Sequence, residues 1–161
     1  MTPRRARVTM VLAAGMFMMA VLAAAQTKDP FVGSWRLDTA KSKYSPGPMP
    51  KSQTTTYEAS GPGYRVSVKS EPASGAAQQW SYTTALDGKE GPITGNNPNA
   101  DMLAVKRIDA NTLESVNKKG GKVTTTQRNV ISADGKTRTV TTTGMDGQGQ
   151  KVNNVAVFTK Q

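Results

Sequence analysis

The sequence of 161 residues contains neither histidine nor cysteine. Without imidazole and thiol side chains, the chain cannot form a Ser-His-Asp or Cys-His catalytic centre, a zinc finger, a disulfide or a haem site with histidine or cysteine ligands. Acidic residues are also few: 11 Asp and Glu stand against 21 Lys and Arg, and the sequence pI is about 10.0. The chemistry that remains is that of carboxylate, amine, hydroxyl and aromatic groups.

The first 25 residues have the composition of an export signal. Three arginines lie within the first seven residues, residues 8–22 are mostly apolar, and residues 23–25 are alanines, which a signal peptidase accepts. We therefore predict a cleaved signal peptide over residues 1–25 and a protein exported to the periplasm or the medium. A retained membrane anchor is the alternative, but the apolar run is shorter than the roughly 20 residues that a spanning helix needs.

Cleavage at this place leaves residues 26–161 as the mature chain. It has 136 residues, and its net charge falls from +10 to +7 because the leader holds three arginines and no acid. This length is typical of one domain, and we predict no membrane span within it. Because no disulfide is available, packing and backbone pairing must supply the stability of the exported protein.

Short β-type runs separated by turn sequences fill the mature chain. Asp-Gly pairs at residues 87–88, 134–135 and 146–147, and Gly-Gly at 120–121, provide residues that tolerate the positive φ of hairpin turns. The runs recur about every 8–12 residues, which is typical of all-β domains. We predict strands at residues 31–37, 52–58, 64–70, 78–86, 101–108, 112–117, 122–132, 136–143 and 152–159.

Most of the predicted connections are short, whereas a two-sheet sandwich needs long crossing connections. We therefore predict an all-β fold, a single antiparallel up-and-down β-barrel of about 8–10 strands. Two connections are longer. Residues 38–51 have room for a short helical turn at residues 39–44 before Pro46 stops it, and residues 91–100 are expected to carry a short edge strand or an irregular loop near Ile93.

Alternation along the strands indicates which side chains face the interior. Trp80 and Tyr82 share one face of their strand. The mature chain holds 18 threonines, with runs at residues 54–56, 124–126 and 141–143 in which neighbours must point to opposite faces. Either β-propensity alone explains these runs, or the barrel interior is lined with hydroxyl groups and water. A small barrel is either filled by side chains or holds one small ligand.

The start of the mature chain resembles the first strand of lipocalins and of fatty-acid-binding proteins. It carries their Gly-x-Trp element, Gly33 and Trp35, with the aromatic Phe31 two residues before the glycine. The closing run at residues 155–160 and the meander of hairpins are also similar to this calycin superfamily, and to small exported bacterial lipocalin-like proteins. The resemblance implies a barrel closed at one end by Gly33 and Trp35, which binds a small, mostly apolar molecule in its interior.

The chain departs from these families in three places. Lipocalins stack a late arginine on the first-strand tryptophan, and here Arg128, Arg138 or Lys160 is available for such a cation–π contact. Fatty-acid-binding proteins hold the ligand carboxylate with an Arg-x-Tyr pair on the last strand, where this chain reads Val-Ala-Val-Phe at residues 155–158. Their helix-turn-helix lid has no counterpart in the short, proline-rich segment 38–51.

A small-molecule site usually combines an apolar, aromatic lining with a few polar groups. We predict a ligand site of four aromatic side chains and two arginine anchors: Tyr57, Trp80, Tyr82, Phe158, Arg107 and Arg128. Each has a plainer interpretation as well, because core packing explains the aromatic residues and solvent exposure explains the arginines. Gly33 and Trp35 are predicted to be structural.

Catalysis by a carboxylate pair is the one enzymatic chemistry open to this composition. Most acidic residues belong to turn sequences, and only Glu58 and Glu114 lie within predicted strands, with nothing to place them near each other. No set of nucleophile, base and orienting group can be assembled. We therefore expect a protein that is not an enzyme and that has no metal and no cofactor.

The basic excess has two interpretations. It is either the solvated surface of an exported protein or the basis of a weak contact with anionic components of the cell envelope. Nucleic acid is not expected, because no aromatic side chains interleave with the lysines to stack bases. The two functional hypotheses are a barrel that binds a small hydrophobic molecule and a non-catalytic envelope protein with a filled barrel and a basic surface.

Overall fold

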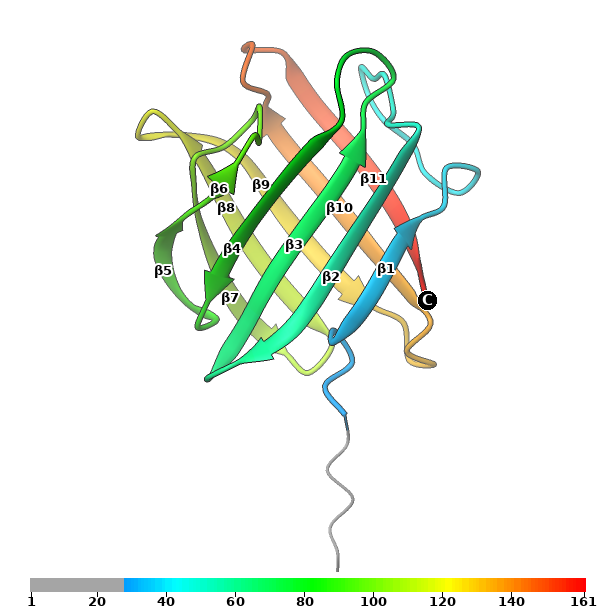
Figure 1. The fold of residues 1–161 in the computed structure, drawn as a ribbon, viewed down its shortest axis with the longest axis vertical. Coiled ribbons are helices and arrows are strands. Elements are labelled where there is room, and N and C mark those ends of the chain that lie inside the picture. The colour runs from blue at the N-terminus through cyan, green and yellow to red at the C-terminus, as the bar shows by residue number, and fades with distance from the viewer. Residues whose placement is uncertain (1–27) are drawn as a thin grey trace, which may run out of the picture.

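The computed structural model describes residues 28–161, so the predicted signal peptide lies outside the described residues. Eleven antiparallel strands form one sheet that curls into a barrel (Figure 1), and residues 28–161 contain no helix. The strands are β1 (Gly33–Leu37), β2 (Ser52–Ser60), β3 (Gly63–Glu71), β4 (Gln78–Thr84), β5 (Asp87–Pro92), β6 (Thr94–Gly95), β7 (Met102–Asp109), β8 (Thr112–Lys119), β9 (Lys122–Ile131), β10 (Thr137–Met145) and β11 (Lys151–Lys160).

The strand order is that of an up-and-down barrel. Reading across the sheet, it is β5-β7-β8-β9-β10-β11-β1-β2-β3-β4-β6. The two ends of this order are consecutive in the chain, because β5 pairs with β7 while β6, beyond Ile93, pairs with β4. One stretch of chain thus joins the two edges of the sheet, and the barrel is nearly closed. The predicted antiparallel barrel is confirmed.

The strand count is higher than predicted because residues 87–92 form β5 where a turn was expected, while β6 is the short edge strand that was one of the two expectations near Ile93. The chain reverses at Leu86, which has a positive φ of 62°, and Asp87 already pairs with Lys106. Gly95 pairs with Trp80 at a φ of 107°, and a Cβ there would lie 2.4 Å from the carbonyl oxygen of Gln79. Only glycine permits this close approach of β6 to β4.

The predicted helical turn at residues 39–44 is wrong. The chain makes one hydrogen-bonded turn there, in which the Lys41 amide donates to the Asp38 carbonyl at 3.3 Å. Lys43 then runs antiparallel to Val155, and each amide donates to the other's carbonyl oxygen at 2.8 Å. Pairing with β11 satisfies the backbone groups that a helix would have satisfied internally, so the segment stays extended.

One end of the barrel is closed by aromatic side chains. Phe31 and Trp35 are completely buried there, and the Trp35 Nε1 donates to the Phe31 carbonyl at 2.8 Å. Lys160 lies with its Nζ 4.9 Å from the centre of the Trp35 ring and donates to the Pro30 carbonyl at 2.8 Å. Of the three candidate cations, Lys160 makes the contact with Trp35. Gly33 has a φ of 126°, which suits glycine at this turn into β1.

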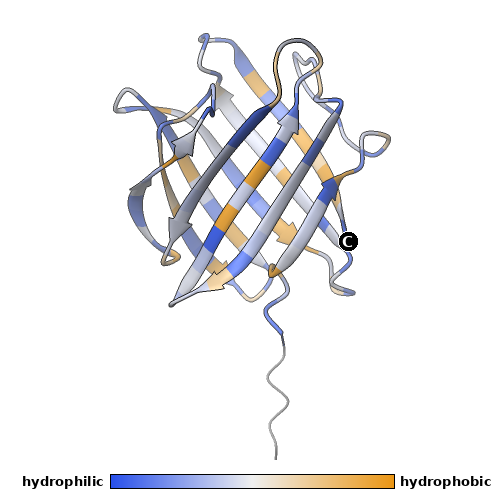
Figure 2. Cartoon of the chain, in the orientation of Figure 1, coloured by the Kyte–Doolittle hydropathy of each residue, from blue (hydrophilic) through white to orange (hydrophobic). Residues whose placement is uncertain are grey.

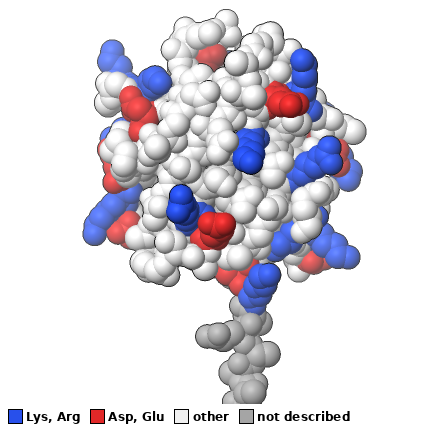
Figure 3. All heavy atoms as spheres, viewed as in Figure 1, with Lys and Arg blue, Asp and Glu red and all other residues white. Residues whose placement is uncertain are grey.

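Inward and outward side chains alternate as a barrel requires. In β3, Tyr64, Val66 and Val68 are buried while Arg65 and Lys69 are exposed, and Figure 2 shows the corresponding alternation of colour along this strand. This periodicity places the apolar residues in a single core inside the barrel. Most charged residues lie on the outside, and Figure 3 shows them scattered over the visible face.

Candidate functional site

The barrel encloses a cavity of about 340 Å³. Inward-facing side chains of the long strands form its wall, and at one end it is bordered by three connecting segments that include Pro46, Pro98 and Asp146. We call this the loop end. Trp35 and Phe31 do not line the cavity, because they lie in the layer that seals the other end of the barrel. The interior is therefore not filled by side chains.

Four of the predicted binding residues lie together on the cavity wall. They come from β2, β4 and β11: Tyr57, Trp80, Tyr82 and Phe158. Burial raises the pKa of the Tyr82 phenol well above its ordinary value, and the neighbouring Tyr57 adds to this shift. The Tyr82 hydroxyl therefore stays protonated at neutral pH and is available as a hydrogen-bond donor.

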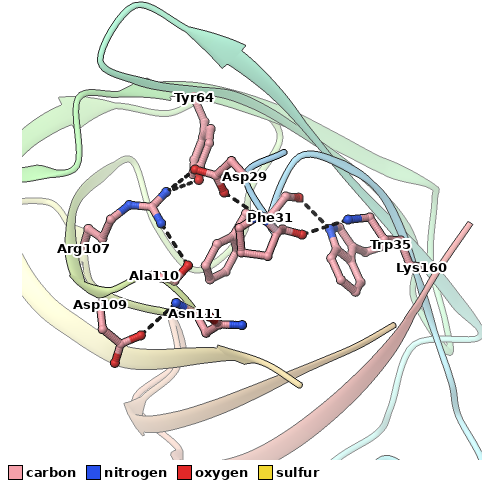
Figure 4. A network of polar contacts seen from close by, with 10 residues as sticks. Asp29, Phe31, Trp35, Tyr64, Arg107, Asp109, Ala110, Asn111 and Lys160 are labelled. Carbon is pink, nitrogen blue, oxygen red and sulfur yellow. Dashed lines mark hydrogen bonds and ion pairs between the residues drawn. The ribbon is translucent and has the colours of Figure 1, made fainter. Parts of the chain in front are cut away.

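Arg107 lies at the closed end, outside the cavity lining. Its guanidinium forms an ion pair with Asp29 at 2.7 Å, donates to the Tyr64 hydroxyl, and lies 5.6 Å from the centre of the Phe31 ring (Figure 4). These contacts attach the segment before β1 to β3 and β7. Burial raises the pKa of the Tyr64 phenol, and its hydrogen bond with Asp29 adds to this rise. In the structure, Arg107 therefore holds this segment against the barrel and does not line the cavity.

Arg128 lies on the outer surface of the barrel. Its side chain is 52% exposed and forms an ion pair with Glu114 on the adjacent strand. The reason is the period of the strand, since its neighbour Asn129 points inward and lines the cavity. Arg128 is therefore not part of the cavity.

The arginine inside the barrel is Arg138 of β10, which the sequence analysis considered only as a cation for Trp35. It is 3% exposed, and its Nη1 donates to the Tyr57 hydroxyl at 2.8 Å and to Asn129 Oδ1 at 3.1 Å. Its Cζ lies 4.1 Å from the centre of the Phe158 ring. The sequence does indicate the inward position of Arg138, because Arg138 shares a strand face with Val140, an apolar residue expected to point inward.

Arg138 has no anionic partner in the part of the chain that the structure describes. None of the five ion pairs found there includes this residue. Its Nε is buried and has no hydrogen-bond partner among the described residues. The Arg138 guanidinium thus lies on the cavity wall. The side chains that bond or contact it there are neutral: Tyr57, Asn129 and Phe158.

Polar side chains line much of the cavity, on β8 and β9 as well as on β2, β3 and β4. We call the polar wall the inward-facing amide and hydroxyl side chains of β8 and β9: Ser115, Asn117, Thr125, Gln127 and Asn129. The two strands are linked across this wall, because Asn117 Nδ2 donates to Thr125 Oγ1 at 3.0 Å and Ser115 Oγ donates to Gln127 Oε1 at 3.4 Å.

The threonine runs contribute to the same interior. The central residue of each run lines the cavity: Thr55, Thr125 and Thr142. Hydroxyl groups therefore do line part of the barrel, and β-propensity alone does not account for the runs.

The described residues offer no site for a metal ion. Among residues 28–161, no three histidine, cysteine, aspartate or glutamate side chains lie close enough together to hold one. In the same residues, no helix is long and apolar enough to cross a membrane.

No protein-family model matches this chain, and no curated protein does. Among solved structures, the chain is similar to zebrafish ileal bile acid-binding protein in complex with cholic acid, with a sequence identity of 15% and a TM-score of 0.47. The alignment covers 82% of this chain and 99% of that chain. The barrel described above is established by the strand pairing of this chain itself.

Proposed function

We propose that the protein binds a small amphipathic molecule inside the barrel, with an anionic group at Arg138 and an apolar body against the aromatic side chains. The observation that carries this proposal is a buried arginine on the wall of an unfilled cavity, with no acidic partner among residues 28–161. The function is one of binding, and it makes no use of a bond-breaking step.

The energetics of a buried cation favour an anionic ligand. Removing a charge from water costs several kcal/mol unless a counter-charge or hydrogen bonds replace the solvent. Tyr57 and Asn129 supply neutral acceptors to Nη1, whereas Nη2 forms no hydrogen bond with any residue in the range 28–161 and leaves donor capacity in the guanidinium. A carboxylate or sulfonate matches the planar donor fork of arginine and forms charge-assisted hydrogen bonds with it.

Part of the lining suits an apolar body. Val66, Val68 and Trp80 line the cavity on β3 and β4, and Leu103 and Val105 continue the apolar surface on β7. The volume of about 340 Å³ lies within the roughly 300–1,000 Å³ of ordinary small-molecule sites. An apolar lining with one convergent charged group is the usual composition of such a site.

A fluorescence titration tests this proposal. The probe is 8-anilinonaphthalene-1-sulfonate, an apolar fluorophore with one sulfonate, which we expect to bind saturably and to be displaced by laurate. In Arg138→Gln, the affinity should fall at least about tenfold, because a hydrogen bond to a charged group contributes about 1.5–3 kcal/mol. Arg128→Gln is the matched control, since it removes an arginine from the outer surface, and it should leave the affinity unchanged.

The alternative is an envelope protein whose barrel binds nothing. It predicts no saturable binding in the wild type, or equal affinities in Arg138→Gln and Arg128→Gln. Urea unfolding of both variants must accompany the titration, because a loss of probe binding counts only for a variant that remains folded.

We also propose that the protein is exported, with residues 1–25 removed. The basic and apolar composition of this segment supports the proposal. The full-length chain should be expressed in a bacterial host, and the mass and N-terminal sequence of the product in the periplasmic fraction should begin at Gln26. Retention of the intact chain in the membrane fraction would favour the anchor instead.

A further inference from the structure

One layer of the cavity lining, near the loop end, is polar on both sides of the barrel. On one side, three polar side chains pair next to one another and line the cavity: Gln53 of β2, Ser70 of β3 and Gln78 of β4. On the other side, a second row follows the register from β8 to β11: Ser115, Gln127, Thr142 and Asn154. We call the side chains of these two rows the polar collar.

The two rows lie at a common level in the barrel. The Arg138 Nη1 donates to the Tyr57 hydroxyl at 2.8 Å, and this contact fixes β10 and β2 relative to each other. Toward the loop end, Thr142 lies four residues beyond Arg138 and Gln53 lies four residues beyond Tyr57. Both rows are therefore about 13 Å along the strands from the contact. Val105 of β7, which pairs with a member of the second row, interrupts the collar.

The layer between this contact and the polar collar is mainly apolar. It consists of the cavity-lining residues two positions from the collar on each strand, and its apolar members are Val68, Trp80, Leu113, Val140 and Ala156. Its polar members are Thr55 and Asn129, and Asn129 already accepts from Arg138. Along its axis, the cavity thus offers first a cation, then mostly hydrocarbon, then amides and hydroxyls.

The polar collar retains hydrogen-bonding capacity. Two of its side-chain oxygens have partners, because Gln127 Oε1 accepts from Ser115 Oγ at 3.4 Å and Asn154 Oδ1 accepts from the Ser45 amide at 2.9 Å. The side chains of the other four members form no hydrogen bond with any residue in the described part of the chain: Gln53, Ser70, Gln78 and Thr142. Carboxamides and hydroxyls both donate and accept, and neither carries a charge.

We infer that the ligand has two polar ends: the anion at Arg138 and, beyond an apolar segment, an uncharged hydrogen-bonding group such as a hydroxyl or an amide at the polar collar. This inference rests on the proposed function, because it takes the anion at Arg138 as the fixed end of the molecule. A hydrocarbon end would displace water from the collar without replacing its hydrogen bonds, which is unfavourable. The collar thereby determines specificity for the second end.

Competition by matched twelve-carbon acids tests the inference. Laurate, 12-hydroxydodecanoate and 6-hydroxydodecanoate share one chain and one carboxylate, and they are compared as competitors of 8-anilinonaphthalene-1-sulfonate below their micelle concentrations. We expect 12-hydroxydodecanoate to bind at least about threefold more tightly than laurate, as one added neutral hydrogen bond at the collar implies. 6-Hydroxydodecanoate should bind more weakly than laurate, because its hydroxyl lies in the mainly apolar layer.

A change in the polar collar should remove this preference. Gln53→Met/Thr142→Val makes one member of each row apolar and breaks no side-chain hydrogen bond among the described residues. In this variant, 12-hydroxydodecanoate should lose its advantage, whereas laurate should bind as tightly as before or more tightly. Gln79→Met/Thr141→Val is the matched control, because Gln79 and Thr141 are exposed neighbours of collar residues and lie outside the cavity lining. It should keep the wild-type order.

The outcomes separate the inference from the proposed function. If laurate displaces the probe from the wild type and 12-hydroxydodecanoate binds no more tightly, the inference is overturned while the proposed function stands. An unchanged preference for 12-hydroxydodecanoate in the folded collar variant overturns the assignment of the second end to the collar. Failure of the probe and of every acid to bind the folded wild type overturns the proposed function as well.

Discussion

Trp35 is the residue on which the closed end of the barrel depends. It is completely buried, its Nε1 is satisfied by the Phe31 carbonyl, and Lys160 covers its ring. No cavity-lining role competes with this structural one, because Trp35 lies outside the cavity. Its contribution should therefore appear in stability.

We predict that Trp35→Ala lowers the free energy of unfolding by about 3–5 kcal/mol, the range for removing a large buried aromatic side chain. Urea denaturation followed by circular dichroism measures this quantity. A loss below about 1 kcal/mol, which is typical of surface substitutions, would show that the ring is not packed as described.

The buried tyrosines make a second prediction at the residue scale. Burial raises the pKa of Tyr82 well above 10.0, and burial also raises the pKa values of Tyr44 and Tyr64. A phenol whose pKa is higher in the folded state holds its proton there after the unfolded chain has lost it, so the folded protein loses stability as the pH rises above about 10. The contribution of these groups is constant below that pH.

Urea midpoints between pH 8 and pH 11 test this linkage. The midpoint should fall above pH 10 in the wild type, and the fall should be shallower in Tyr82→Phe, which has no phenol to ionise at this position. Equal slopes in the two proteins would mean that Tyr82 ionises as readily in the folded state as in the unfolded chain.

At the scale of elements, the segment before β1 acts as a plug for the closed end. Asp29 pairs with Arg107, Phe31 packs under Tyr64, and the Pro30 carbonyl accepts from Lys160 (Figure 4). The ion pair is partly exposed, with 27% of the Arg107 side chain accessible, so its own contribution is modest.

We predict that Arg107→Gln lowers the free energy of unfolding by about 1 kcal/mol, in line with a partly exposed ion pair. It should also speed amide exchange in residues 28–32, because the segment loses its tie to β7. Binding of 8-anilinonaphthalene-1-sulfonate should not change. A tenfold loss of probe affinity in the folded variant would show instead that Arg107 anchors the ligand, as the sequence analysis proposed.

Strands in which apolar and polar residues alternate, and which end at a clear turn sequence, were predictable from the sequence. β3 and β9 alternate buried and exposed residues, so their faces follow from the pattern alone. Within the segment 87–95, a short edge strand near Ile93 was one expectation, but β5 was not predictable, because its residues Asp-Gly-Lys-Glu-Gly-Pro have neither alternation nor β-branched side chains. The strands of this segment exist because two sheet edges need a partner, and that requirement arises only when the barrel is assembled.

The candidate site was predictable in part, for a related reason. Period two assigns a side chain to the inside or the outside, which is why Arg138 is inward beside Val140 and Arg128 is outward beside Asn129. It does not give the height along the barrel. Arg107 shares a strand face with Val105 yet lies in the plug layer below the cavity, since the height depends on strand tilt and on the bulge between Arg107 and Asp109.

At the scale of the whole molecule, the barrel is stabilised without disulfides and leaves its centre open. The plug closes one end, residues 87–95 join the sheet edges, and the cavity has a lining of mixed polar and apolar side chains. The acidic and basic side chains are distributed over the outside (Figure 3), and a weak contact with anionic envelope components remains a prediction. The buried cation of Arg138 is the feature that distinguishes this interior from a simple hydrophobic one.

The most direct test of the central claim is the NMR signal of the Arg138 Nε–Hε group during a titration with laurate. The signal is assigned by its absence from Arg138→Gln. We predict that it shifts progressively and saturates at the same concentration as the displacement of the fluorescent probe, because an anion bound at this guanidinium changes the chemical environment of its Nε–Hε group. A signal that stays in place while laurate displaces the probe would contradict the placement of the anion at Arg138.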